Sequence, residues 1–260
     1  MAGLFDNQAE IYLDARPNYP SDWYSKLSDL TLHHSLAWDV GTGNGQAAVS
    51  VAEHYERVIG TDISKAQLKY TIPHPRVQYK HTPSSMSENE LVALIGGDNS
   101  VDLVTVAEAV HWFDLQKFYS IVTRVLKKPG GIIAVWGYNK LQVNPEFDRV
   151  KKELHDATMA FWNPKVSYLF EGYKTLAFPF ESVGLGFEGE PMALEIPKKL
   201  SFEGFLRVVK SSSAFASAME QGVDLLSENL VKKLENAWGG QDLIRSVTYK
   251  AFMLAGKVKI

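Results

Sequence analysis

Between residues 36 and 137, short apolar runs alternate with stretches in which apolar residues recur at helical spacing. One such stretch places Ala47, Ala48, Val51, Ala52 and Tyr55 on a single helical face. This alternation predicts βαβ units and a mostly parallel sheet that is covered on both faces. We expect strands at 36–40, 57–62, 77–80, 101–106 and 132–136, and helices at 46–55 and 116–126.

The pattern changes in the second half of the chain. Aromatic residues become frequent over 138–200 and prolines interrupt the regular repeats, which we interpret as an insertion that roofs a pocket. The apolar pattern then predicts a strand at 190–196, a helix at 225–238 and a final strand at 248–258.

The length of 260 residues is enough for one large domain with a full core. We therefore expect a single domain, residues 1–260, in four parts. These parts are N-terminal lid helices (1–35), a cofactor-binding core (36–137), a substrate-cap insertion (138–200), and C-terminal helices with the final strands (201–260).

Composition narrows the function classes. The formal net charge of -3 provides no basic field for a phosphate backbone, so we expect no nucleic-acid partner. The chain has no cysteine, which excludes disulfides and thiolate metal ligands. No secretory pattern begins the chain and no apolar run approaches the roughly 18 residues of a membrane span, so we expect no membrane partner and a cytoplasmic location.

The most informative motif is Asp39-Val40-Gly41-Thr42-Gly43-Asn44-Gly45, at the expected turn from the first strand into the first helix. Glycine allows a ligand to approach the backbone closely. Asp62 ends the second expected strand, the position from which an acid binds the ribose hydroxyls of an adenosine. A dinucleotide fingerprint reads GxGxxG, whereas this chain has DxGxGxG, which favours S-adenosylmethionine (SAM) over NAD.

Further motifs make the resemblance more specific. Phe5, Tyr12 and Arg16-Pro17-x-Tyr19-Pro20 precede the glycine turn, and Ala107-Glu108-Ala109-Val110-His111-Trp112-Phe113-Asp114 follows the fourth expected strand. With these motifs the chain resembles the class I SAM-dependent methyltransferases, in particular the subgroup similar to trans-aconitate methyltransferase and its plant relatives. The resemblance implies a Rossmann-like, doubly wound, seven-stranded, mostly parallel sheet with an antiparallel last strand.

The resemblance also implies where the cofactor SAM, and its product S-adenosylhomocysteine, would bind. The glycines would approach the methionine part, Asp62 would hold the ribose, Ser84 and Ser85 would border the adenine, and Ala107 with Glu108 would pass beneath the methionine part. The full set of expected cofactor-binding residues is Tyr12, Asp39, Gly41, Thr42, Gly43, Gly45, Asp62, Ile63, Ser84, Ser85, Ala107 and Glu108.

The methyl acceptor is expected to be a small molecule, most simply a carboxylate that becomes a methyl ester. Arg16 is suited to binding a carboxylate, which needs no base because it is already ionised. A hydroxyl or amine acceptor is the alternative, with His111 as the base. Arg16 and His111 are thus the candidate catalytic residues, no metal is required, and the candidate substrate-binding residues are Trp112, Phe113, Trp162 and Tyr173.

Two other classes stay open at this stage. An NAD-dependent oxidoreductase shares the fold but would normally carry GxGxxG and a recognisable catalytic Tyr-Lys or His arrangement. The second is a non-catalytic SAM-binding module. The aromatic cap does not favour this class, because a protein that only binds SAM needs no acceptor pocket. The sequence does not distinguish a monomer from a homodimer.

Overall fold

The structure is a computed structural model that describes residues 16–259. Five parallel strands form the first part of the sheet, and their bounds agree with the expected strands to within a few residues at most ends. They are β1 (Leu36–Val40), β2 (Arg57–Asp62), β3 (Val77–His81), β4 (Leu103–Ala107) and β5 (Ile132–Gln142). The exception is β5, which continues six residues beyond the expected end at residue 136.

Three further strands complete the sheet on the other side of β5. They are β6 (Glu181–Ser182), β7 (Met192–Leu200) and β8 (Arg245–Lys257), which give the order β3-β2-β1-β4-β5-β8-β6 with β7 also paired to β8. The reversal of strand order at β1 confirms the predicted Rossmann-like doubly wound fold, and β8 is antiparallel to β5 as expected. The eighth strand is the two-residue β6, which pairs with Lys257 and Gly256 beyond the end of the β7 pairing.

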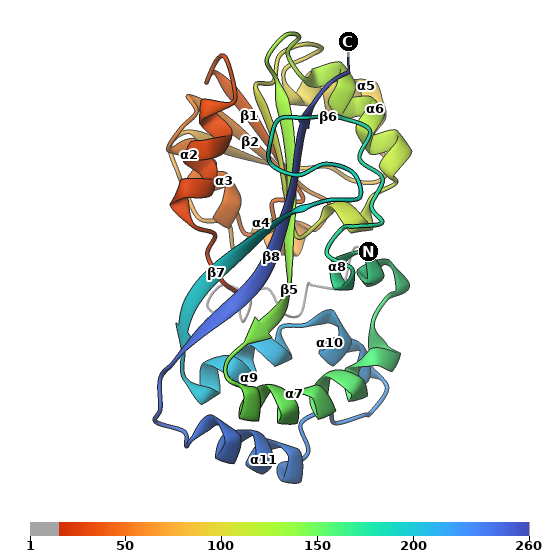
Figure 1. Ribbon diagram of the computed structural model, residues 1–260. Coiled ribbons are helices and arrows are strands. Elements are labelled where there is room, and N and C mark those ends of the chain that lie inside the picture. The colour runs from red at the N-terminus through yellow and green to blue at the C-terminus, as the bar shows by residue number, and fades with distance from the viewer. Residues whose placement is uncertain (1–15, 260) are drawn as a thin grey trace.

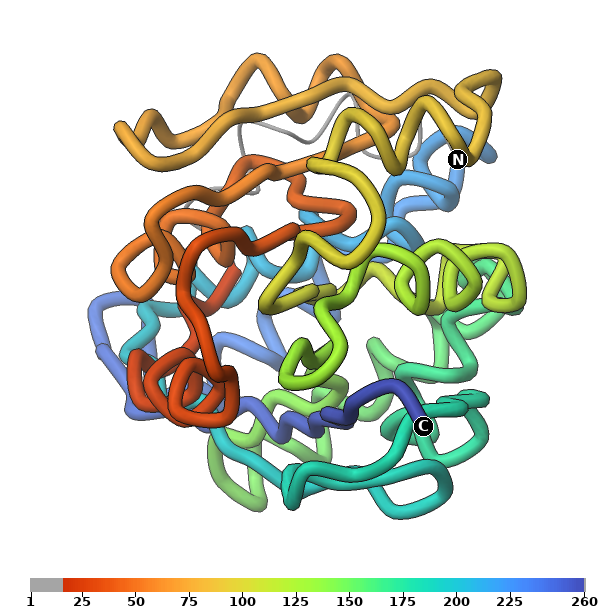
Figure 2. Tube along the Cα trace, turned by 90° about the horizontal axis from the view of Figure 1, so that it is seen from above, coloured from red at the N-terminus to blue at the C-terminus, as the bar shows by residue number. Residues whose placement is uncertain are grey.

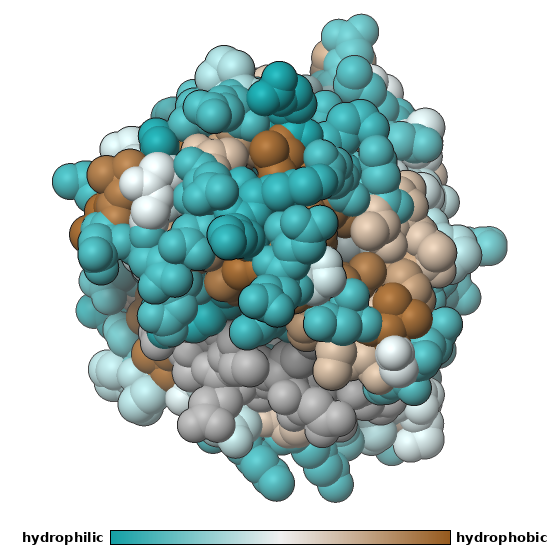
Figure 3. Space-filling view, turned by 90° about the horizontal axis from the view of Figure 1, so that it is seen from below, coloured by the Kyte–Doolittle hydropathy of each residue, from teal (hydrophilic) through white to brown (hydrophobic). Residues whose placement is uncertain are grey.

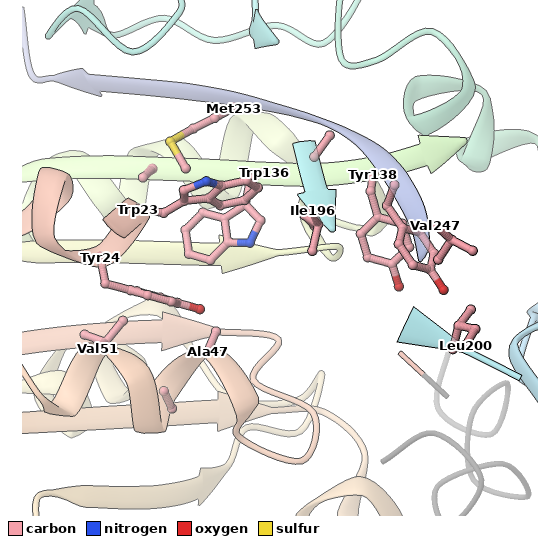
Figure 4. Close-up of a cluster of buried hydrophobic side chains, with 14 of the residues drawn as sticks. Trp23, Tyr24, Ala47, Val51, Trp136, Tyr138, Ile196, Leu200, Val247 and Met253 are labelled. Carbon is pink, nitrogen blue, oxygen red and sulfur yellow. The ribbon is translucent and has the colours of Figure 1, made fainter. Parts of the chain in front are cut away.

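Helices cover both faces of the sheet (Figure 1). On one face, α2 (Ser21–Asp29) and α3 (Gln46–Ala52) share a hydrophobic cluster that includes Trp23, Tyr24 and Trp136 (Figure 4). On the other face, α5 (Glu88–Ile95) and α6 (Leu115–Val125) pack over a second cluster. The short helix α4 (Lys65–Leu68) follows β2. Viewed from above, β3 and the C-terminal strand lie on opposite sides of the molecule (Figure 2).

The two helices on the second face, α5 and α6, each begin at a side chain that accepts from a first-turn backbone amide. Ser87 and Glu90 form a reciprocal capping box at the start of α5, and Asp114 accepts from the amide of Lys117 at the start of α6. Within α6, the buried residues recur at helical spacing, which is why the sequence pattern located this helix within one residue at each end.

A helical layer lies at the far ends of β5, β7 and β8 (Figure 1). Its aromatic centre is Phe147, Phe205 and Trp238, whose ring centroids lie 4.9 Å, 5.0 Å and 6.0 Å apart pairwise. The outer surface of the molecule on this side is mostly hydrophilic, with scattered hydrophobic side chains (Figure 3). The layer and its connections comprise α7 (Pro145–Thr158), η3 (Met159–Phe161), η4 (Pro164–Val166), α8 (Ser167–Phe170), α9 (Phe202–Lys210), α10 (Ser213–Glu220) and α11 (Glu228–Trp238).

The layer therefore draws on two parts of the sequence. Helices α7 and α8 come from residues 138–200, whereas α9, α10 and α11 come from residues 201–260. In the N-terminal part, α2 packs on the sheet, with Trp23 and Tyr24 edge-on to Trp136. Residues 1–15 of the expected lid lie outside the described residues. Along 16–259, no helix is both long and apolar enough to cross a bilayer.

We expect Phe147→Ala to lower the free energy of unfolding by about 3–5 kcal/mol, because it removes a fully buried ring from the centre of the helical layer. Urea unfolding followed by tryptophan fluorescence would measure the loss. Phe187→Ala is the control, since this ring is 46% exposed. Equal effects of the two substitutions would contradict the assignment of Phe147 to the core of the layer.

Candidate active site

The glycine turn between β1 and α3 is left-handed at all three glycines, with φ of 66° at Gly41, 57° at Gly43 and 88° at Gly45. A side chain at Gly45 would place its Cβ 2.1 Å from the hydroxyl oxygen of Tyr79, so this glycine is required by packing within the protein. Among the described residues, the nearest atom to such a Cβ at Gly43 is Oε1 of Gln67, at an ordinary contact distance of 3.8 Å. Within the described part of the chain Gly43 is thus much less crowded than Gly45, which suits a ligand lying against the turn.

Asp62 lies at the end of β2, next to that turn. Its Oδ2 accepts from the amide of Gly43 and its Oδ1 from the amide of Ser64, both at 2.8 Å. Burial raises the pKa of Asp62 from its ordinary value, and the hydrogen bonds from the two amides oppose that rise. Each carboxylate oxygen can accept a further hydrogen bond, so the predicted ribose contact is compatible with these bonds.

Asp39, at the start of the motif, is 1% exposed and, unlike Asp62, is bound by hydroxyl groups in the interior of the protein. Its two oxygens accept from the hydroxyls of Thr42 and Thr105, both at 2.6 Å. Burial raises the pKa of Asp39 to about 6, and these two hydrogen bonds lower it. Asp39 and Thr42 therefore hold the turn against β4 from beneath it.

The remaining expected cofactor residues lie at the carboxyl edge of the sheet, where ligands of doubly wound folds bind. Ile63 follows β2 and is 37% exposed, and Ala107 ends β4. Ser84 and Ser85 are exposed in the turn after β3. Tyr12 lies outside the described residues.

A cavity of about 620 Å³ lies between this edge and the helical layer. Its walls are mainly apolar and come from β5, α7, η3, α8, α9 and β8, and from the loop after β4. Among the described residues that line it, four are cationic and two carry carboxyl groups. The cations are Arg16, Lys140, Lys151 and Lys152, and the carboxyl groups are those of Glu108 and Asp148.

Glu108 directly follows β4, at the edge of the sheet where the cofactor is expected. Its side chain also lines the cavity. Its backbone is left-handed, with φ of 56°, which is uncommon for a residue with a side chain. Its Oε1 accepts from the amide of Tyr138 at 2.5 Å. Burial raises the pKa of Glu108 to about 7, while the Tyr138 amide and the charge of Arg16 oppose that rise.

Arg16 reaches the same cavity from the N-terminal segment. Its guanidinium donates to the hydroxyl of Tyr138 at 3.1 Å and to the carbonyl of Ser211 at 3.0 Å. The structure thus brings Arg16 and Glu108 together around one residue of β5, because the backbone amide of Tyr138 binds Glu108 and its hydroxyl binds Arg16.

His111 lies in η2 (Val110–Trp112), where it is 2% exposed and lines the cavity. Its Nδ1 lies 3.1 Å from the hydroxyl of Tyr173. Burial lowers the pKa of His111 to about 3, and the charge of Lys165 lowers it further. The ring is therefore neutral at ordinary pH and accepts protons weakly.

The four expected substrate-binding aromatics occupy different places. Trp112 and Trp162 line the cavity. The ring of Phe113 instead faces Gly41, whose Cβ position would be 3.4 Å from the ring. Tyr173 is fully buried beneath His111 and packs on Phe252, with its ring centroid 4.8 Å from that of Phe252, so it reaches the cavity only through His111.

Sequence reasoning missed several cavity residues. The sequence pattern ended β5 at residue 136, although Tyr138, Lys140 and Gln142 continue it along the cavity. Tyr249 of β8 also lines the cavity and packs edge-on to Tyr138. The alternation of apolar and polar residues over 138–142 was the one available signal for the longer strand. Over residues 16–259, no cluster of three or more His, Asp or Glu residues is placed to hold a metal ion.

A doubly wound sheet with an open glycine turn and an acid at the end of β2 defines a nucleotide-cofactor-binding α/β enzyme. The family described as "Methyltransferase domain" matches residues 38–135. The chain is 33% identical to a protein of Anaeromyxobacter dehalogenans assigned as a type II methyltransferase. That similarity covers 93% of this chain and 97% of the other, with a TM-score of 0.78.

Two further relatives agree. A protein of Dictyostelium discoideum assigned as a methyltransferase is 28% identical over 97% of this chain and 94% of its own length. Methyltransferase cfoB of Aspergillus candidus is 35% identical over 50% of this chain and 42% of its own length. The chain therefore belongs to the class I SAM-dependent methyltransferases.

We expect Gly43→Ala to weaken binding of S-adenosylhomocysteine at least tenfold while the protein stays folded, because the new methyl group meets no described atom closer than 3.8 Å and would lie where the cofactor is expected to approach the turn. Calorimetry would measure the affinity. Gly222→Ala is the matched control, since Gly222 is also left-handed, with φ of 73°, and faces open space. Unchanged affinity in a folded Gly43→Ala variant would place the cofactor elsewhere.

The raised pKa of Glu108 predicts a pH-dependent cost in stability. The folded protein favours the protonated carboxyl, so stability falls as pH rises from the ordinary pKa of 4.5 to about 7. Glutamine keeps the acceptor for Tyr138 without the charge. We expect Glu108→Gln to raise the free energy of unfolding by roughly 1–3 kcal/mol at pH 8 and far less near pH 4.5, as measured by urea unfolding. An equal difference at both pH values would contradict this account.

Proposed function

We propose that this enzyme transfers the methyl group of SAM to a carboxylate of a small molecule and so forms a methyl ester. The observation that carries the proposal is the excess of cationic side chains in an otherwise mainly apolar cavity beside the cofactor edge. Such walls suit an acceptor with an apolar body and an anionic group. The acceptor class of the trans-aconitate-like subgroup, which the sequence resembles, agrees with this proposal.

The size of the cavity supports a small molecule. Cavities of roughly 300–1,000 Å³ are typical of small-ligand sites, and this one has a volume of about 620 Å³. The formal net charge of -3 gives no support for a nucleic-acid acceptor. One chain supplies all of the cavity walls described above, so either a monomer or a homodimer would contain the complete cavity.

The open turn at Gly43 and the carboxylate of Asp62 fit the cofactor, and these residues would hold its methionine and ribose parts. When bound, SAM supplies a methyl group on a positively charged sulfur. Arg16 and Lys140 would attract and orient the acceptor carboxylate, since the other two cavity lysines are paired with Asp148 and Asp156. The apolar side chains of α8 and α9 that line the cavity would exclude water, so that alignment supplies most of the rate acceleration.

The state of His111 also supports a carboxylate acceptor. A carboxylate has already lost its proton, so its methylation needs no base. The burial that lowers the pKa of His111 to about 3 makes this ring a weak proton acceptor. In this proposal His111 contributes to the cavity wall and is held there by Tyr173.

We expect Arg16→Ala to lower kcat/KM for carboxylate acceptors about 10- to 100-fold with little change in S-adenosylhomocysteine affinity, because the cation faces the acceptor. Transfer of labelled methyl from SAM to decanoate, trans-cinnamate and other monocarboxylates would measure this. Arg76→Ala is the matched control, since Arg76 also donates to a backbone carbonyl but does not line the cavity. Methylation of the matched alcohols or amines but of no carboxylate would overturn the proposal.

A further inference from the structure

Glu108 is the one carboxyl group that lines the cavity without an ion-pair partner at close range among the described residues. Its Oε1 is held by the amide of Tyr138, which fixes the orientation of the carboxyl group. Its Oε2 makes no hydrogen bond within residues 16–259 and remains available to a molecule in the cavity. A carboxylate acceptor has already lost its proton, so its methylation does not require Oε2 of Glu108 as a base.

The backbone conformation of Glu108 also supports a functional role for this residue. The residue adopts the left-handed conformation directly at the end of β4, the edge at which the cofactor binds. Such conformations cost free energy and persist mainly where function or surrounding structure requires them. At this position the conformation places the carboxyl group beside the backbone of β5, on the wall of the cavity.

We propose that Glu108 is a catalytic proton acceptor through which the same cavity methylates hydroxyl acceptors, phenols in particular. Oε2 of Glu108 takes the proton of the acceptor O–H as the acceptor oxygen bonds to the methyl carbon. The bond between that carbon and the sulfonium sulfur breaks, and its electron pair stays on sulfur as a neutral thioether. The proton then leaves Glu108 for solvent, so atoms and charge balance.

The groups around Glu108 suit this role. Arg16 faces it from the N-terminal segment and, with Lys140 of β5, would stabilise the negative charge that develops on a phenol oxygen. Lys152 of α7 is paired with Asp156 at 2.6 Å. Asp148, the other acid of the cavity, is paired with Lys151 at 2.6 Å.

Three neighbouring titratable rings do not compete for the proton, and a further ring, that of His155 of α7, also lines the cavity. Burial keeps His111 neutral and raises the pKa of Tyr173 and of Tyr249, so both phenols stay protonated. A carboxyl group with a pKa of about 7 is ionised in a large fraction of molecules at neutral pH yet still basic enough to accept a proton.

The inference rests on methyl transfer taking place in this cavity, but not on the acceptor being a carboxylate. Two probes of similar shape separate the two proposals. Methyl 4-hydroxycinnamate offers a phenol and no carboxylate, whereas trans-cinnamate offers a carboxylate and no hydroxyl. Both are tested with the full-length protein and SAM, as wild type, Glu108→Gln and His111→Gln.

With the phenol probe, we expect kcat/KM of the wild type to rise with pH and to level off above about pH 7. Glu108→Gln should lower that rate at least 100-fold at pH 8 and remove the inflection, while His111→Gln should keep the inflection. Glu108→Gln should lower the ratio of the phenol rate to the trans-cinnamate rate at least tenfold, which separates loss of the base from a general loss of activity. Glu188→Gln is the matched control, since its carboxylate also accepts from a backbone amide, that of Phe178, away from the cavity.

Two results would overturn the role of Glu108. One is an absence of phenol methylation by the wild type, whatever happens with trans-cinnamate. The other is a Glu108→Gln variant that is folded, binds S-adenosylhomocysteine normally and keeps its phenol rate within tenfold of wild type. Failure of the trans-cinnamate arm alone would count against the carboxylate proposal and leave Glu108 as the base for phenols.

Discussion

The antiparallel pairing of β5 with β8 is the interaction on which both halves of the site depend. The ladder begins at Ile132 opposite Lys257, inside the doubly wound sheet, and ends at Gln142 opposite Thr248, under the helical layer. At about 3.3 Å per residue, eleven residues of β5 span roughly 36 Å. One strand thus passes the cofactor edge at Trp136, which is opposite Ala107 at the end of β4, and continues as a cavity wall from Tyr138 to Gln142. This continuity sets the distance between donor and acceptor.

Within that strand, Tyr138 links the two charged groups that matter most for the acceptor. Its amide holds Glu108 and its hydroxyl receives a hydrogen bond from Arg16. The carboxyl group therefore experiences burial, which favours its neutral form, and a nearby cation, which favours its charged form. Burial is the larger of the two effects, so the pKa of Glu108 is raised to about 7. A cavity with this balance can serve acceptors that have already lost a proton as well as those that must still lose one.

Much of the cofactor-binding part of the site could be predicted, because the residues that define it lie close together in the sequence. The turn glycines and Asp62 lie within 22 residues of each other, and the strands β1 and β4 are apolar except at Asp39 and Thr105. The cavity was less accessible to prediction, because it joins residues that are far apart in the chain, such as Arg16 with Ser211. The weak basicity of His111 could not be predicted either, since it arises from burial, which no local pattern reports.

The contact between Gly45 and Tyr79 has a consequence for how this chain can change over evolution. Tyr79 stands on β3 and donates to the carbonyl of Ile72, and its hydroxyl occupies the space that a side chain at Gly45 would need. Replacing Tyr79 with a smaller residue first removes the nearest atoms, while the backbone strain at Gly45 stays. Replacing Gly45 first creates a steric clash. The two positions are thus coupled, and the order of substitution decides whether the intermediate sequence can fold.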